Sequence, residues 1–218
     1  MKNQIVPTML THSLKEFQEK LELIGSHFDL LQIDCMDNKF VQNKTYCDAD
    51  KIRKIRTFKG NYELHLMVSN PLAVIKKWQS YKKVKKIIFH YESMKDDQAV
   101  FDLIKYIQKK KIEVGLAINP ETDLTKIKKF LPEIDTVLLM AVEPGWGGQT
   151  LNPDILNKAK LIRLQYPKLN IEIDGGVDLE NMSRVLDSGV NIISAGSMFF
   201  KSENIKETIK QAKELIKK

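Results

Sequence analysis

The chain alternates between short apolar runs and longer amphipathic stretches. Each apolar run is rich in β-branched residues, hardly alternates with polar positions and ends at a polar residue or a glycine, as strands buried on both faces do. We therefore expect eight strands, at Gln4–Thr8, Asp29–Asp34, Tyr62–Val68, Lys86–Tyr91, Glu113–Ile118, Thr136–Met140, Asn170–Asp174 and Asn191–Ala195.

The stretches between these runs have the spacing of helices. Apolar residues recur at helical intervals from Leu14 to Ile24, from Ile155 to Ile162 and from Ile205 to Ile216. Two helix starts are indicated by a capping residue directly before a proline, at Asn70–Pro71 and at Asn152–Pro153.

Strands that alternate with helices form βαβ units and a parallel sheet. Eight such units predict a (β/α)₈ barrel, the TIM barrel, and with no linker or low-complexity stretch we expect one domain over residues 1–218. The alternative is an open doubly wound sheet, which carries a GxGxxG turn after its first strand. Residues 9–12 follow that strand and read Met-Leu-Thr-His, with no glycine, so we set the alternative aside.

Composition is that of an ordinary soluble globular protein, with 43% hydrophobic and 29% charged residues. The formal net charge of +7 comes mainly from lysines in short clusters such as 82–86 and 109–111. We interpret these clusters as solvated surface, because no aromatic residues interleave with them and arginine is scarce, so nucleic-acid binding is not expected. The positive field still favours an anionic substrate.

No apolar run is long enough to span a bilayer, and the first four residues lack the apolar centre of a signal peptide. The two cysteines, Cys35 and Cys47, lie outside any CxxC motif, so we expect neither a disulfide framework nor a zinc site. Cys35 alternates with Asp34 and should be a small core residue facing away from the barrel mouth. Together these features predict a cytoplasmic protein with no membrane partner.

The ends of the expected strands are rich in functional groups. In barrels of this type the active site forms where the strands end. Glycines also follow the last three strands, and the loops after strands seven and eight often bind phosphate through backbone N–H groups. Polar or sulfur-bearing side chains at or just beyond strand ends are Thr8, Gln32, Asp34, Asp37, His65, Met67, His90, Glu92, Asn119, Met140, Asp174 and Ser197.

Several of these segments together resemble the ribulose-phosphate 3-epimerase family, in family order and over nearly the whole chain. The loop after the sixth strand and the Asp-Gly-Gly-Val segment are highly specific in combination. The matching segments are Ile33–Asp37, His65–Val68, Val114–Thr122, Leu139–Gln149, Ile171–Val177 and Ala195–Ser197.

The resemblance implies epimerisation of D-ribulose 5-phosphate to D-xylulose 5-phosphate by inversion at C3. Asp34 and Asp174 would be the acid–base pair, because two carboxyl groups on opposite sides can take a proton from one face and return it to the other. A divalent metal held by Asp34, His65 and Asp174 would stabilise the enediolate. Met36, Met67 and Met140 match the family's methionines above that metal, although core packing explains them equally well. The expected substrate-binding residues are Thr8, His65, Gly145, Trp146, Gly147, Gly148, Gly175, Gly176, Gly196 and Ser197.

The chain departs from the family mainly around its second strand. Gln32 stands where the family has its first metal-binding histidine, Asn38 replaces a glycine and Gln42 replaces a proline. Thr8 stands for a serine and Trp146 for a phenylalanine. A glutamine carbonyl binds zinc or iron less well than imidazole does, so Gln32 is a doubtful fourth ligand. Of zinc, iron, manganese and magnesium, we expect a weakly held ion with a preference for the harder manganese or magnesium.

Two alternatives remain open from the sequence, and a third is disfavoured. The altered loop around Asn38 and Gln42 also fits an epimerase acting on a hexulose 6-phosphate such as D-allulose 6-phosphate. The loss of a metal histidine also fits a non-catalytic sugar-phosphate-binding protein. Decarboxylase or aldolase chemistry is disfavoured, because related barrels carry Asp-x-Lys-x-x-Asp and this chain has Met36 at the lysine position. We expect a small-molecule sugar phosphate as ligand and a homo-oligomer formed through the outer helices.

Overall fold

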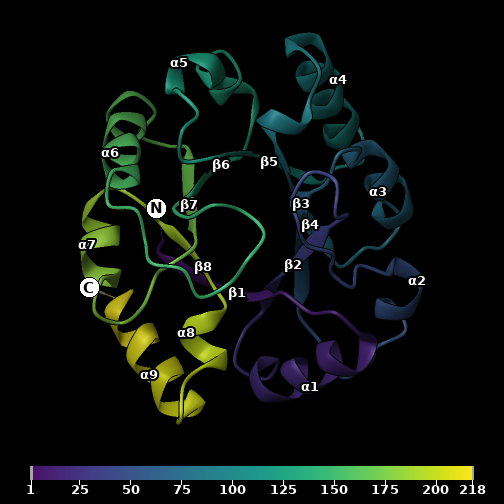
Figure 1. The fold of residues 1–218 in the computed structure, drawn as a ribbon, viewed down its shortest axis with the longest axis vertical. Coiled ribbons are helices and arrows are strands. Elements are labelled where there is room, and N and C mark those ends of the chain that lie inside the picture. The colour runs from purple at the N-terminus through teal and green to yellow at the C-terminus, as the bar shows by residue number, and fades with distance from the viewer. Residues whose placement is uncertain (1, 218) are drawn as a thin grey trace.

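A computed structural model of the protein describes residues 2–217. Parallel strands form a closed barrel in chain order from β1 to β8, and helices surround it (Figure 1). The predicted (β/α)₈ barrel is therefore confirmed, and each expected strand forms with ends shifted by at most two residues. The strands are β1 (Gln4–Met9), β2 (Leu30–Met36), β3 (Asn61–Met67), β4 (Val84–His90), β5 (Glu113–Ile118), β6 (Thr136–Met140), β7 (Asn170–Asp174) and β8 (Ile192–Ala195).

The helices occupy the outer layer, and their starts follow local capping chemistry. Asn70 caps α3 as expected, since its side chain accepts from the backbone N–H of Ala73. The expected start at Asn152–Pro153 is wrong by two residues: α6 begins at Ile155, and Asn152 instead accepts from the backbone N–H of Asp154. The helices are α1 (Leu14–Ile24), α2 (Ala49–Ile52), α3 (Pro71–Trp78), α4 (Asp97–Gln108), α5 (Leu124–Ile127), α6 (Ile155–Gln165), α7 (Met182–Asp187), α8 (Ser197–Phe200) and α9 (Ile205–Leu215). Short 3₁₀ turns lie at Tyr91–Ser93 and Leu131–Glu133.

Alternate residues of each strand face the barrel interior or the helices. On β2 the residues Ile33 and Cys35 are buried in the main hydrophobic core, which also contains Phe17 of α1 and Trp78 of α3. Gln32 and Asp34, which alternate with these two residues along β2, face inward. There the side chain of Gln32 contacts Asp34 and also Asp174 on β7. This alternation is what places polar groups inside the barrel and apolar groups beneath the helices.

The two cysteines form a disulfide, which corrects the expectation that the chain has none. Cys35 on β2 and Cys47 in the loop before α2 are joined, with 5.4 Å between their Cα atoms. Cys35 does face away from the barrel mouth and into the core, as expected. Its partner was missed because pairing depends on how the loop folds back, and two cysteines twelve residues apart carry no local sign of it. Disulfides are rare in reducing compartments, so one ground for a cytoplasmic location is removed.

Replacing Cys47 by alanine is expected to lower the free energy of unfolding by about 3 kcal/mol, the entropy of opening a loop of this size in the unfolded chain. Urea titrations of the wild type and the variant, each with and without reductant, would measure it. Reductant should destabilise the wild type and leave Cys47→Ala unchanged. Equal stability of oxidised and reduced wild type would contradict the prediction.

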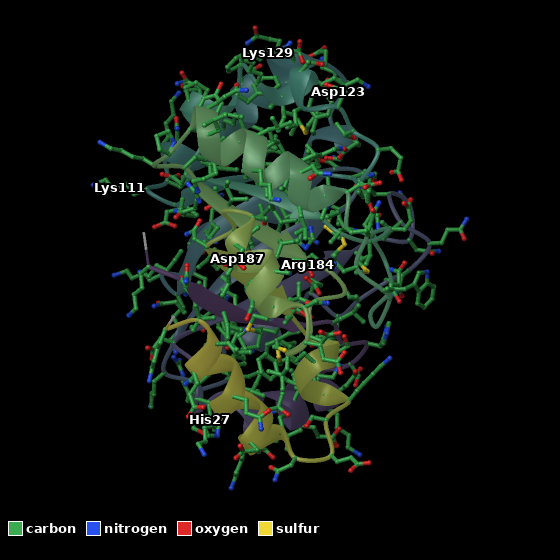
Figure 2. The ribbon with its side chains drawn as sticks, turned by 90° about the vertical axis from the view of Figure 1, so that its left-hand side faces the viewer. His27, Lys111, Asp123, Lys129, Arg184 and Asp187 are labelled. Carbon is green, nitrogen blue, oxygen red and sulfur yellow. A yellow bond between two sulfur atoms is a disulfide. The ribbon has the colours of Figure 1, made fainter. Side chains whose placement is uncertain are left out.

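The outer surface bears most of the lysines, and Figure 2 shows Lys111 and Lys129 at the edge of the molecule. The solvated interpretation holds for Lys82 and Lys85 but is wrong for Lys86, which is buried inside the barrel. Among residues 2–217, no helix is both long and apolar enough to cross a membrane.

Candidate active site

A cavity of about 410 Å³ opens at the carboxyl ends of the strands. Asp34 and Asp174 reach it from β2 and β7, and Met36, Met67 and Met140 line it as well. His65 is the one expected substrate-binding residue that does not line the cavity, because it is fully buried beneath it. The other expected residues all line it: Thr8, Gly145, Trp146, Gly147, Gly148, Gly175, Gly176, Gly196 and Ser197.

Two carboxylates and an imidazole converge below this cavity. One oxygen of Asp34, one oxygen of Asp174 and a ring nitrogen of His65 lie within 4.8 Å of one another. Barrel closure and strand register create this meeting, since Asp34 pairs with His65 across β2 and β3 while Asp174 comes from the far side on β7. The three donors can hold a divalent cation.

The side chain of Gln32 lies in the middle of this cluster. Its Nε2 donates to Asp34 Oδ1 at 2.8 Å and to Asp174 Oδ2 at 2.8 Å, and it lies 3.3 Å from His65 Nδ1. Its Oε1 lies 3.1 Å from the hydroxyl of Ser194, which donates to Glu172 at 2.6 Å. The residue expected as a doubtful metal ligand thus turns N–H groups, and not its carbonyl oxygen, toward the centre.

The charges of the cluster shift one another's pKa values. Burial alone would lower the pKa of His65, but hydrogen bonds and attraction to Asp174 and Asp34 outweigh burial and raise it to about 10. Burial raises the pKa of Asp174, and the neighbouring charge of Asp34 adds to the effect. Such shifts gather where carboxylates share a confined space, as they do in acid–base sites.

A second polar layer supports His65 from the side of β4. The Nε2 atoms of His65 and His90 lie 2.9 Å apart, and the two rings stack with centroids 5.1 Å apart. Glu92 accepts from the backbone N–H of Asn119 and from the hydroxyl of Thr122. These contacts place His90 and Glu92 behind His65, and neither residue lines the cavity.

Comparison with known proteins identifies the family. The Ribulose-phosphate 3 epimerase family matches residues 4–200 of the chain. The chain belongs to the ribulose-phosphate 3-epimerase family. As a member it is an isomerase, a sugar-phosphate epimerase.

Relatives named ribulose-phosphate 3-epimerase match most of the chain. The ribulose-phosphate 3-epimerase of Schizosaccharomyces pombe is 31% identical over 94% of this chain and 90% of its own length. That of Buchnera aphidicola is 34% identical over 92% of this chain and 89% of its own length. The fold is also shared with the 3-keto-L-gulonate-6-phosphate decarboxylase of Vibrio cholerae, with a TM-score of 0.75 at 13% identity over 100% of this chain and 98% of that one.

The glycine loops of this epimerase pack too closely for side chains. Gly176 has a φ of 68°, and a β-carbon there would collide with the backbone of Leu151. Gly148 has a φ of 78° and lies against the Nζ of Lys201, a cavity-lining lysine that we did not anticipate from the sequence. Trp146 at the tip of the β6 loop is 60% exposed. At Gly148 and Gly176 the wall of the cavity is therefore formed by backbone atoms, with no room for a side chain.

The loop after β2 accommodates Asn38, one of the departures from the family. Asn38 has a φ of 58°, a left-handed conformation that asparagine tolerates better than most residues, so it can replace a glycine. Asp37 accepts from backbone N–H groups of Lys39, Phe40 and Ser69. These bonds outweigh burial and lower the pKa of Asp37 to about 2. Asp37 therefore organises this loop and does not line the cavity.

A buried ion cluster under the site was not predicted. Lys86 lies between two buried carboxylates, 2.8 Å from Glu63 and 2.7 Å from Glu172. Burial and the charge of Glu172 raise the pKa of Glu63 well above its ordinary value. A signal was available, since each of these residues interrupts or borders an apolar run expected to be buried on both faces, where a charge needs a partner.

Proposed function

We propose that the protein interconverts D-ribulose 5-phosphate and D-xylulose 5-phosphate by inverting C3, with Asp34 and Asp174 as the acid–base pair. The observation that carries this proposal is the approach of these two carboxylates, from β2 and β7, at the floor of the cavity. Membership of the family and the names of the relatives agree with it.

The chemistry follows from having one carboxyl group on either side of the substrate. One ionised aspartate takes the proton from C3, beside the ketone, and the bonding electrons move into an enediolate. The other aspartate, protonated at that moment, delivers its proton to the opposite face of C3. The net change is inversion, and each turnover leaves the two carboxyl groups with their protonation states exchanged.

Three side chains of the site could hold a divalent cation only if the amide of Gln32, which lies between them, moved aside. Two carboxylates and one imidazole form its ligand set, namely Asp34, Asp174 and His65, which favours manganese or magnesium over softer ions. When bound, the cation would act as a Lewis acid toward the enediolate. Gln32 presents Nε2 to this centre, and an amide N–H cannot coordinate a cation, so we leave Gln32 out of the ligand set.

The phosphate of the substrate would bind at the side of the cavity formed by the loops after β6, β7 and β8. Gly176, Gly196 and Ser197 line this side, and in such barrels the loops after the last two strands often bind phosphate. Lys201 adds a positive charge beside Gly148. The sugar would then extend from this anchor toward the aspartates.

The test is proton exchange in deuterium oxide. Purified protein is incubated separately with D-ribulose 5-phosphate and with D-allulose 6-phosphate, and C3 is followed by NMR. We expect deuterium at C3 together with formation of the epimer for the pentulose, and slower turnover for the hexulose. Absence of deuterium at C3 of both sugars, with and without added manganese or magnesium, would refute the proposed function.

Replacing Lys201 by methionine is expected to raise KM for the sugar phosphate about tenfold with little change in kcat, because a charge-assisted contact to the phosphate is lost far from C3. Steady-state kinetics would measure both constants. Lys82→Met, which removes an exposed lysine outside the cavity, is the matched control. An unchanged KM in Lys201→Met would show that this lysine does not bind the phosphate.

We further propose that residues 1–218 form a single domain and that the protein is a homo-oligomer assembled through its outer helices. Light scattering on the eluting peak of a size-exclusion column would give the assembled mass. A monomer at micromolar concentration would contradict the second part.

A further inference from the structure

Gln32 stands where a cation bound by the cluster would have to lie. A cation would take oxygen and nitrogen ligands at about 2.0–2.2 Å. The Nε2 of Gln32 instead meets one oxygen of each aspartate at 2.8 Å, which is the length of a good N–H···O hydrogen bond. The amide has two hydrogens on Nε2, one for each carboxylate, so a single side chain links the acid–base pair.

The orientation of this amide follows from what surrounds it. Ionised carboxylates only accept hydrogen bonds, so an amide oxygen turned toward them would add a third acceptor to a cluster in which His65, 3.2 Å from Asp174 Oδ2, is the remaining donor. Gln32 is fully buried, and its Oε1 end lies 3.1 Å from the Ser194 hydroxyl. With the N–H end toward the aspartates, the two carboxylates gain donors where they would otherwise repel each other.

The support of Gln32 continues into the barrel interior. Ser194 contacts Glu172, and Glu172 pairs with the buried Lys86. All three side chains are buried, on β8, β7 and β4. Gln32 is thus held from below by a chain of buried polar side chains, of which Ser194 also borders the cavity.

We propose that Gln32 is a positioning residue whose two N–H groups hold Asp34 and Asp174 together, so that proton transfer at C3 proceeds in the metal-free protein. The proposal rests on the proposed function and adds to it a role for the residue in which the chain departs from the family's metal site. Hydrogen bonds from one amide do here what a shared cation does elsewhere: they bring two like charges together and fix their directions.

The first experiment uses the unaltered protein. The protein is stripped with a chelator, its metal content is checked by elemental analysis, and C3 deuterium incorporation into D-ribulose 5-phosphate is measured. We expect less than 0.1 metal ion per chain and a rate within about twofold of the untreated protein. A stripped protein that is inactive and recovers with manganese, magnesium, zinc or iron would overturn the role of Gln32 while the proposed function stands.

Two variants then separate positioning from packing. Gln32→Met keeps a similar volume and removes both N–H groups, and its metal-free kcat should fall about 100-fold with KM little changed, as for misplaced catalytic groups. Gln32→His supplies an imidazole, and we expect it to bind one Co²⁺ per chain with a visible absorption band that the wild type lacks at the same Co²⁺ concentration. Its activity should then become sensitive to chelator.

The outcomes are distinguishable. Full metal-free activity in a folded Gln32→Met would overturn the positioning role, and so would equal Co²⁺ binding by the wild type and Gln32→His. Circular dichroism monitors folding, and if Gln32→Met does not fold, the Co²⁺ titration and the stripped wild type still decide. No deuterium incorporation by the wild type in any metal state would refute the proposed function itself, and the role of Gln32 would fall with it.

Discussion

Asp174→Asn is expected to lower kcat for C3 epimerisation by about 1000-fold, because an amide can neither take the proton from C3 nor return it. KM should change little, since the phosphate anchor is untouched. The same loss is expected for Asp34→Asn. Inversion needs both carboxyl groups, but exchange on one face needs only one. Each variant should therefore retain deuterium exchange with one epimer alone, and the two variants should retain it with opposite epimers.

NMR of both epimers in deuterium oxide would measure these rates. Asp187→Asn makes the same chemical change at an exposed residue of α7 that does not line the cavity (labelled in Figure 2), and should leave kcat unchanged. If inversion survives in either active-site variant, the two-aspartate mechanism is wrong. If one variant still exchanges deuterium with both epimers, the aspartate replaced in that variant does not transfer the proton.

Lys86→Met is expected to lower the free energy of unfolding by about 3–5 kcal/mol, because it leaves Glu63 and Glu172 buried without their common cation. Urea unfolding followed by circular dichroism would measure it. The neighbouring Lys85 is exposed, so Lys85→Met is the matched control and should stay within about 0.5 kcal/mol of the wild type.

A triple replacement shows whether charge is the cause. Lys86→Met combined with Glu63→Gln and Glu172→Gln removes the unpaired charges along with the lysine. It should recover much of the stability lost by Lys86→Met alone, since burying neutral groups costs far less than burying charges. A triple variant as unstable as Lys86→Met would point to packing as the reason.

Much of the barrel was predictable because its signals are local. A strand buried on both faces needs an unbroken apolar run, and the polar residue that ends each run marks the carboxyl edge of the barrel. Asp34 and Asp174 could be singled out in this way, and the glycines at 175, 176 and 196 could be assigned to the cavity wall. The family resemblance supplied their chemistry.

The errors came from contacts between distant parts of the chain. Lys86 sits in a run of lysines and was interpreted as surface, although strand direction turns it into the barrel, where its partners are on β3 and β7. Cys35 and Cys47 were interpreted as unpaired, and only the path of the β2 loop brings them together. Lys201 directly follows α8 and contacts Gly148 in the loop after β6, a contact with no local signal in the sequence.

Gln32 shows which of its properties the sequence determines and which only the tertiary structure determines. Its place in the sequence, two residues before Asp34, determined that it faces the barrel interior beside that aspartate, because side chains alternate along a strand. What its amide does was decided by Asp174, which lies 142 residues away and meets it only because the barrel closes. Sequence patterns report which way a side chain points, whereas hydrogen bonds depend on which atoms the closed barrel brings within 3 Å, about the reach of such a bond.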